Sequence, residues 1–279
     1  MYRIQQPWPV IFILLVLLLS SGCSTHHYKN LKKNAEMLAV DAGFKPIYFD
    51  TKWFQIYGLE KIKVPINKKL IIYIEGDGQA WKTRFKISKN PTPRKPLSLY
   101  LAIQDSYENI IYLARPCQFV DAEITSNCSP EYWTSHRYGE KVLNSYHAVL
   151  NQIRKSYNIK NFEIVGYSGG GVIAALLAGQ RHDVSRLTTV ASNLDHFKWT
   201  QHHKVSPLKG SLDLYSNDLD FATIVQRHFW GAQDEIVNYE MNKVLLEKLD
   251  NTYLKYYIYE QFNHSCCWVE NWGTIKYKE

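Results

Sequence analysis

Short apolar runs alternate with amphipathic segments along most of the chain, and this alternation predicts strands and helices in turn. Segments 69–74 (KLIIYI) and 109–114 (NIIYLA) have the length and composition of strands buried on both faces. Between Val142 and Ile153 the apolar residues recur at the spacing of one helix face. Further strands are expected at 46–57, 59–64, 162–166, 187–192, 221–229 and 253–260, and further helices at 96–103, 170–179, 239–249 and from about 268. The pattern predicts an α/β fold, with a mostly parallel sheet and helices on both faces.

The first 22 residues have the anatomy of a signal peptide. Arg3 precedes an apolar stretch from Val10 to Leu19, which is too short to span a bilayer comfortably. Small residues then lead to Cys23, so that LSSGC resembles a bacterial lipobox with Cys23 as the acylated residue. Ser20 stands where leucine is commonest in that pattern, which leaves ordinary cleavage and an uncleaved anchor as alternatives.

These features predict a bacterial protein that a lipid anchor holds at the cell envelope. If the host is Gram-negative, Ser24 after the cysteine suggests sorting to the periplasmic face of the outer membrane. We expect residues 23–45 to be a polar tether and residues 46–279 to be one domain, a size that suits a single core. Within that domain, residues 193–216 lack periodicity and are expected to form a cap or lid segment.

Composition narrows the class of partner. Charged residues make up 21% of the chain, as in ordinary globular proteins, and the formal net charge is +7. We expect this charge to be spread along the chain without a basic block with interleaved aromatic residues, so nucleic acid is not an expected partner. A basic surface beside anionic lipid is the milder inference.

The cysteines suit an oxidising compartment. Without Cys23, four remain, and four cysteines allow three pairings. Cys117 and Cys128 lie in one polar loop after segment 109–114, so we expect a disulfide between them. Cys266 and Cys267 are adjacent and either stay reduced or form an unusual bond to each other.

A serine lies at the junction of a predicted strand and a predicted helix. Residues 166–170 (GYSGG) match the pattern G-x-S-x-G, which places a nucleophilic serine on a sharp turn. The glycines leave room for the neighbouring backbone, so Ser168 is the expected nucleophile.

Two later strand ends supply a base and an acid. His264 follows segment 253–260, and Asp234 follows segment 221–229. Because the carboxyl ends of parallel strands meet at one edge of a sheet, we expect His264 to reach Ser168 and Asp234 to reach the other side of the imidazole, in the chain order Ser, Asp, His of the α/β-hydrolase triad. A serine hydroxyl needs such a base, and the base needs an acid to orient it. Asp195, after segment 187–192, remains an alternative acid.

An oxyanion hole requires two backbone N–H groups. We expect one from Gly169, which follows the serine, and one from the turn after segment 69–74, given by Asp77 or Gly78. A carboxylate aimed at a developing oxyanion would oppose catalysis. The side chain of Asp77 is therefore expected to turn away and tie down its loop.

Seven motifs carry a resemblance to the α/β-hydrolase superfamily, over residues 46–279. They are YIEGDG (73–78), LARPC (113–117), YWTSHR (132–137), GYSGGG (166–171), NLDH (193–196), VSPLKGSL (205–212) and HSCCW (264–268). More narrowly, the chain resembles a group of exported bacterial α/β-hydrolase-like lipoproteins. The resemblance implies an α/β-hydrolase fold and a serine hydrolase with Ser168, Asp234 and His264 in the triad roles. The acidic EGDG replaces the histidine-glycine of many members, which leaves the oxyanion donor open.

The expected function is hydrolysis of an ester, thioester or amide of a small-molecule or lipid-like acyl substrate, with no cofactor and no metal. Tyr167, Trp133 and Asp195 are the expected substrate contacts, and for the aromatic and basic cluster around Trp133 a helix cap with packed aromatics is an equal alternative. A non-catalytic binding or scaffold lipoprotein and an acyltransferase remain as rival functions.

Two other chemistries fit less well. Residues 169–174 also match G-x-G-x-x-A, with Asp195 about 20 residues later, but a dinucleotide site would leave Asp234 and His264 unexplained. Asp195 and His196, with His202 and His203, match no standard metal-ligand spacing.

Overall fold

The computed structural model describes five segments of the chain: residues 29–63, 69–120, 127–215, 218–249 and 252–278. The predicted signal peptide and Cys23 lie outside them. Among the helices of these segments, none has both the length and the apolar character that crossing a bilayer requires.

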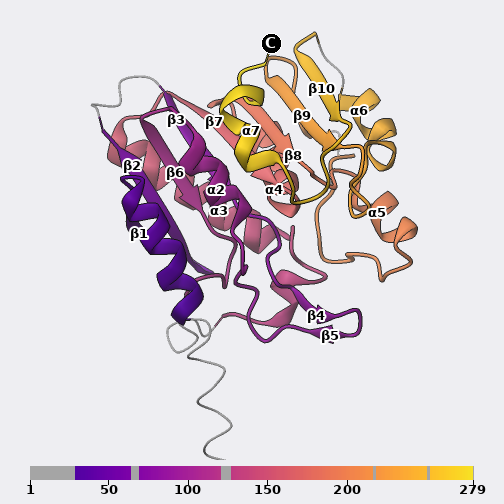
Figure 1. Ribbon diagram of the computed structural model, residues 1–279, viewed down its shortest axis with the longest axis horizontal. Coiled ribbons are helices and arrows are strands. Elements are labelled where there is room, and N and C mark those ends of the chain that lie inside the picture. The colour runs from indigo at the N-terminus through magenta and orange to yellow at the C-terminus, as the bar shows by residue number, and fades with distance from the viewer. Residues whose placement is uncertain (1–28, 64–68, 121–126, 216–217, 250–251, 279) are drawn as a thin grey trace, which may run out of the picture.

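One sheet of eight strands organises the molecule, in the order β1-β2-β6-β3-β7-β8-β9-β10 (Figure 1). β1 and β2 form an antiparallel hairpin, and β2 is antiparallel to β6. The other neighbours in the sheet, from β6 to β10, pair in parallel. The strands are β1 (Lys45–Asp50), β2 (Gln55–Ile62), β3 (Lys69–Ile74), β6 (Asn109–Leu113), β7 (Asn161–Tyr167), β8 (Val184–Val190), β9 (Val225–Gly231) and β10 (Leu254–Tyr259).

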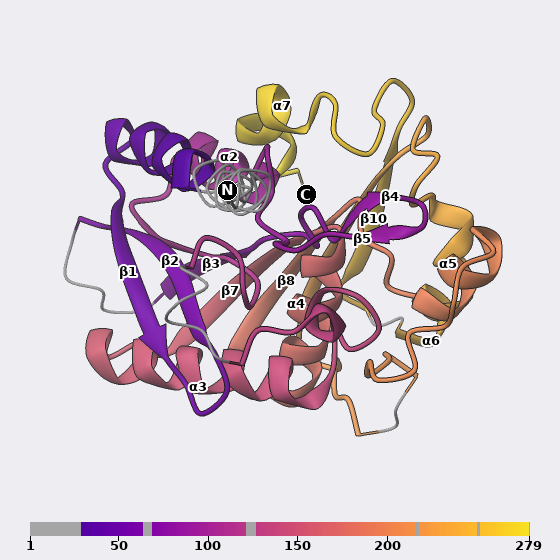
Figure 2. The same cartoon turned by 90° about the horizontal axis from the view of Figure 1, so that it is seen from below.

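Helices cover both faces of this sheet, as Figure 2 shows. Alternate side chains of a strand point to opposite faces, so β3 sends Leu70, Ile72 and Ile74 to one core and Ile71 and Tyr73 to the other. The first core includes helices α3 (Glu140–Tyr157), α4 (Gly169–Gln180) and α6 (Lys243–Leu249), and the second includes α2 (Leu97–Gln104), α7 (Trp268–Ile275) and a helix at residues 29–41. The predicted α/β class is confirmed.

Some elements differ from the expectation. The segment expected to be a tether contains the helix 29–41, whose Ala35 and Ala39 are buried in the second core. The single helix expected at 239–249 is a 3-10 turn, η2 (Tyr239–Met241), followed by α6. The segment 193–216 contains a helix, α5 (His196–His202).

A small antiparallel hairpin was not predicted at all. It consists of β4 (Trp81–Thr83) and β5 (Lys86–Ile87), and it projects beyond the edge of the sheet where β3 ends (Figure 1). A short 3-10 helix, η1 (Pro130–Trp133), packs near its base. The residues of the hairpin do alternate, with Lys82, Arg84 and Lys86 between Trp81, Thr83, Phe85 and Ile87, and this strand-like signal was not used in the prediction.

Candidate active site

Ser168 lies at the turn between β7 and α4, with φ 50° and ψ −124°. A side chain with positive φ is strained, and the surrounding backbone maintains this conformation. Gly166 makes the turn possible, because a Cβ there would lie 2.4 Å from the carbonyl oxygen of Gly170. The Ser168 N–H donates to the carbonyl of Val190 on β8. These contacts hold the serine hydroxyl clear of the sheet.

The residues after β9 and β10 supply an aspartate and a histidine, and the histidine lies between the aspartate and Ser168. His264, which follows β10, has its Nε2 atom 3.1 Å from Ser168 Oγ and its Nδ1 atom 2.9 Å from Asp234 Oδ2. An ionised carboxylate can only accept, so Nδ1 carries the proton and Nε2 accepts from the serine hydroxyl. The other carboxylate oxygen of Asp234 accepts from the N–H groups of Ile236 and Val237, at 2.9 and 2.8 Å. Asp234 is therefore fixed and buried, while His264 stays accessible at the site.

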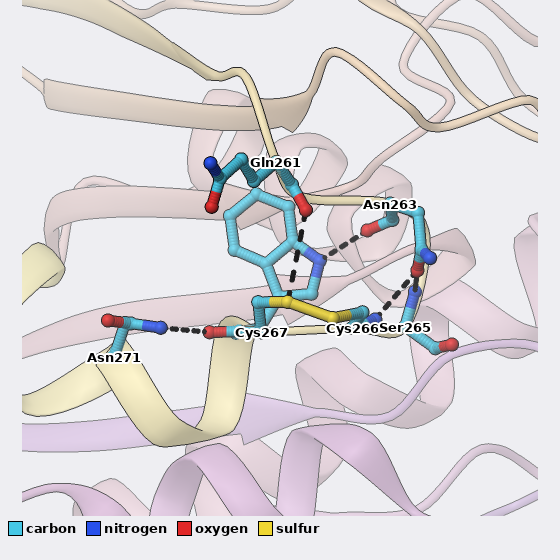
Figure 3. The surroundings of a disulfide bond; sticks show 7 residues. Gln261, Asn263, Ser265, Cys266, Cys267 and Asn271 are labelled. Atoms are coloured by element: carbon cyan, nitrogen blue, oxygen red, sulfur yellow. Dashed lines mark hydrogen bonds between the residues drawn. A yellow bond between two sulfur atoms is a disulfide. The ribbon is translucent and has the colours of Figure 1, made fainter.

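The loop that carries His264 is fastened at several points (Figure 3). Asn263 Oδ1 accepts from the N–H groups of Ser265 and Cys266, and its carbonyl accepts from the Trp268 indole. On the other side of the loop, the Tyr167 hydroxyl donates to the carbonyl of His264 at 3.0 Å. The backbone on either side of His264 is therefore fixed by hydrogen bonds.

The turn after β3 brings Asp77 close to Gly169, the residue that follows Ser168. Its carboxylate pairs with the guanidinium groups of Arg115 and Arg137, at 3.0 and 2.7 Å. Burial alone raises the pKa of Asp77, but the two arginines outweigh this effect and lower it. A Cβ at Gly169 would lie 2.2 Å from Asp77 Oδ1, so only glycine fits there. The carboxylate thus ties down its loop, and the two arginines balance its charge.

Two N–H groups of this turn are open. Gly76 donates to Glu75 Oε1, and Gln79 donates to the carbonyl of Pro91. Within the described part of the chain, the N–H groups of Asp77 and Gly78 have no acceptor. Asp77 and Gly78 line a pocket of about 340 Å³ together with Tyr167, Ser168 and His264. The rest of its wall consists of Glu75, Gly76, Gln79 and residues 93–95.

Comparisons with known proteins identify the fold that carries this site. The profile of the family described as "Alpha/beta hydrolase of unknown function (DUF915)" matches residues 136–194, which run from before α3 to just after β8. An esterase of Pyrococcus furiosus superposes with a TM-score of 0.54, at 13% identity, over 80% of this chain and 84% of the esterase.

The protein has the α/β-hydrolase fold. A putative lipase of Acinetobacter baumannii shares this fold with a TM-score of 0.54, at 15% identity, over 84% of this chain and 89% of the lipase. A membrane phospholipase A, described as a novel bacterial virulence factor, superposes with a TM-score of 0.52 at 16% identity. The superposition covers 95% of this chain and 93% of the phospholipase chain. No curated protein sequence is significantly similar to this chain.

Two of the predicted substrate contacts lie away from the pocket. The Trp133 indole donates to the carbonyl of Ser88, and Trp133 does not line the pocket. Asp195 caps α5 by accepting from the Lys198 N–H, and it also accepts from the Tyr215 hydroxyl. Its carboxylate therefore supports the segment 193–216 and is not the partner of His264.

The wall of the pocket includes Pro93, Arg94 and Lys95, whereas none of the described residues 193–215 lines it. The prediction that 193–216 forms a cap or lid stays a prediction. The four residues weighed as metal ligands, Asp195, His196, His202 and His203, form no metal-binding group within the described segments.

Glu75 was not predicted as part of the site. Its buried carboxylate accepts from the N–H groups of Gly76 and Ser98 and from the Tyr112 hydroxyl. Burial raises its pKa to about 7, although these hydrogen bonds act in the opposite direction. Arg115 was also missed, because it lies 38 residues from Asp77 and no sequence spacing predicts such an ion pair.

Both pairs of cysteines are oxidised. Cys117 and Cys128 form a disulfide across the loop after β6, and Cys266 and Cys267 form the bond between neighbours (Figure 3). The second bond lies two residues beyond His264, at the start of α7.

Proposed function

We propose that this protein is a serine hydrolase that cleaves a carboxylic ester, with a thioester or an amide as further substrate types. The observation that carries the proposal is the continuous hydrogen-bonded chain from Ser168 through His264 to Asp234, at the wall of a pocket. The α/β-hydrolase fold, which it shares with an esterase and a putative lipase, supports the same class of reaction.

In the proposed reaction, Ser168 Oγ attacks the substrate carbonyl while His264 Nε2 takes its proton. The carbonyl carbon becomes tetrahedral, and its oxygen becomes an oxyanion. His264 then gives the proton to the leaving alcohol as the carbon–oxygen bond breaks. Water repeats the sequence on the acyl-enzyme and releases the acid. Asp234 holds the imidazole in the correct tautomer and stabilises its charged form.

The proposed oxyanion hole combines the N–H of Gly169 with that of Asp77 or Gly78. Such a donor typically contributes about 3–4 kcal/mol in the transition state. The arginines that bind the carboxylate of Asp77 support this role, because they balance the negative charge next to the developing oxyanion.

The proposed substrate is a small-molecule or lipid-like acyl ester, and the proposed location is the bacterial envelope. The lipobox-like sequence before Cys23 supports a lipid anchor, and two or more acyl chains would hold the protein stably on a membrane. The fold that this protein shares with a membrane phospholipase A supports a lipid-like substrate.

A fluorophosphonate probe tests the reaction class. We expect it to label the folded, disulfide-intact protein and to fail on Ser168→Ala, while Ser265→Ala, beside the histidine, is labelled like the wild type. No labelling of folded wild-type protein would favour the scaffold alternative. If an added alcohol acceptor yields a new ester instead of the free acid, the protein is an acyltransferase.

A further inference from the structure

The hairpin of β4 and β5 presents apolar side chains to solvent. Phe85 at its tip is 88% exposed, and Trp81 and Ile87 are 42% and 39% exposed. Trp81 and Ile87 are direct cross-strand partners, so their side chains share one face. We call residues 81–89 the basic hairpin. Three large apolar groups gathered on a projecting element indicate a contact surface, whereas single exposed ones need no explanation.

Positive charge surrounds these apolar groups. Between Asp77 and Asp105 the chain has six basic residues and no acidic one. All six are exposed, and none forms an ion pair within the described part of the chain; they are Lys82, Arg84, Lys86, Lys89, Arg94 and Lys95. We expected no basic block with interleaved aromatic residues, and the basic hairpin corrects that expectation.

The base of the basic hairpin is fixed by hydrogen bonds to neighbouring segments, while Phe85 at its tip projects into solvent. The N–H groups of Ser88 and Gln79 donate to the carbonyls of Ala80 and Pro91, respectively. The Trp133 indole N–H donates to the carbonyl of Ser88. These bonds set the direction in which the tip projects. The surface is therefore built into the fold.

The basic hairpin is also continuous with the active site. Gly78 and Gln79 precede it and line the pocket, and Pro93 to Lys95 line the pocket shortly after it. Whatever binds the hairpin is therefore held at the mouth of the pocket that contains Ser168.

We propose that the basic hairpin docks the protein on a bilayer that contains anionic phospholipid, with Phe85 in the interfacial region and the basic side chains against the head groups. Aromatic side chains favour the membrane interface, and Lys and Arg near an anionic surface add attraction.

The described chain begins on the same side as the hairpin. The first residues of helix 29–41 and the hairpin both lie at the lower edge of Figure 1 and face the viewer in Figure 2. Cys23, the proposed acylated residue, is six positions before residue 29, a reach of about 20 Å. Docking at this edge turns the pocket mouth toward the bilayer.

Insertion of the hairpin can be measured directly on the full chain. The probe is an environment-sensitive fluorophore on Thr83→Cys, with Ser156→Cys on α3 as the control position and the chain without an introduced cysteine as the blank. The vesicles contain phosphatidylcholine alone or with about one third phosphatidylglycerol. We expect the label at residue 83 to enter the bilayer only in the anionic vesicles, and the label at residue 156 to stay in water. Ser168→Ala serves as the background, so the result does not depend on whether the protein is a hydrolase.

Charge variants test whether the basic side chains cause the attraction to anionic lipid. Replacing Lys82, Arg84 and Lys86 with glutamine is expected to reduce the insertion equilibrium on the order of 100-fold. The matched control triple is Lys155→Gln, Lys160→Gln and Lys255→Gln. These exposed residues lie at the other end of the fold, near the end of α3 and the starts of β7 and β10, and their replacement is expected to change the insertion equilibrium less than about threefold. Thermal unfolding shows that both triple variants fold.

A label at residue 83 that stays in water on anionic vesicles, or that inserts equally without anionic lipid, overturns the proposal. Loss of binding to a single-stranded RNA probe in the hairpin triple, without bilayer insertion, also overturns it and indicates a nucleic-acid surface.

Discussion

At the scale of single residues, the environment decides which aspartate can orient His264. Asp234 and Asp195 both follow strands of the parallel sheet, and both are buried. Asp234 has one oxygen on the imidazole and the other on two backbone N–H groups. Asp195 instead uses its oxygens on the first turn of α5 and on Tyr215. The hydrogen-bond partners distinguish the two residues where the sequence order alone did not.

We expect Asp234→Asn to lower kcat about 10⁴-fold with the fold intact, because the amide favours the wrong imidazole tautomer. Asp195→Asn is the matched control. It is expected to keep the rate and to lose at most about 1 kcal/mol of unfolding free energy, because asparagine also caps helices. Steady-state rates with a short-chain ester and urea unfolding check both. A larger rate loss in Asp195→Asn than in Asp234→Asn would reverse the assignment.

Glu75 makes stability depend on pH. Its pKa rises from an ordinary value of 4.5 to about 7 in the folded protein, because it is buried. The folded state therefore retains a proton that the unfolded chain releases, so the contribution of Glu75 is complete below pH 4.5 and is lost as the pH rises to about 7. We expect a loss of about 3 kcal/mol over this range. In Glu75→Gln, which has no such proton, the unfolding free energy should lack this decline when measured by urea titration at both pH values. Equal declines in the two proteins would contradict the assignment.

At the scale of elements, burial separates what the sequence predicted from what it did not. β3 and β6 are apolar on both faces and were predicted almost to the residue. Helix 29–41 buries only two small residues, Ala35 and Ala39, so its sequence resembles that of a polar tether. The same limit applies to the site. Ser168, Asp234 and His264 each follow a predictable strand, whereas the ion pairs of Asp77 depend on loops that only tertiary packing brings together.

The two disulfides should differ in their effect on stability. The Cys117–Cys128 bond spans a separation of 11 residues, so in the chain-entropy model its loss costs about 3 kcal/mol. The Cys266–Cys267 bond joins neighbours and closes no long loop, so we expect Cys266→Ser with Cys267→Ser to change the global unfolding free energy by less than about 1 kcal/mol. Urea unfolding of the two double variants, each compared with the wild type, measures the difference. A larger loss in the second variant would show that the neighbouring bond supports the core.

At the scale of the whole molecule, the proposed anchor and the active site belong to one arrangement. The pocket opens where the parallel strands end, and helix 29–41 begins toward the same side (Figure 1). A short tether after Cys23 would therefore keep the pocket close to the membrane surface.

We expect the mature protein to begin at Cys23 and to carry at least two acyl chains. Mass spectrometry of the N-terminal peptide from membrane-extracted protein measures this. Cys23→Ser, which removes the acylated thiol, should abolish the mass increment. An unmodified start at another residue, or an intact Met1, would contradict the anchor.

The place of β10 in the sheet has a consequence for biosynthesis. His264 follows this strand, which is the last strand of the described chain and lies at the edge of the sheet. Ser168 and most of both cores precede it, so a nascent or C-terminally shortened chain can hold the nucleophile but lacks the base. The proposed hydrolysis would therefore become possible only after residue 264 has been synthesised and β10 has joined the sheet, and a chain that ends before residue 264 would be inert toward esters.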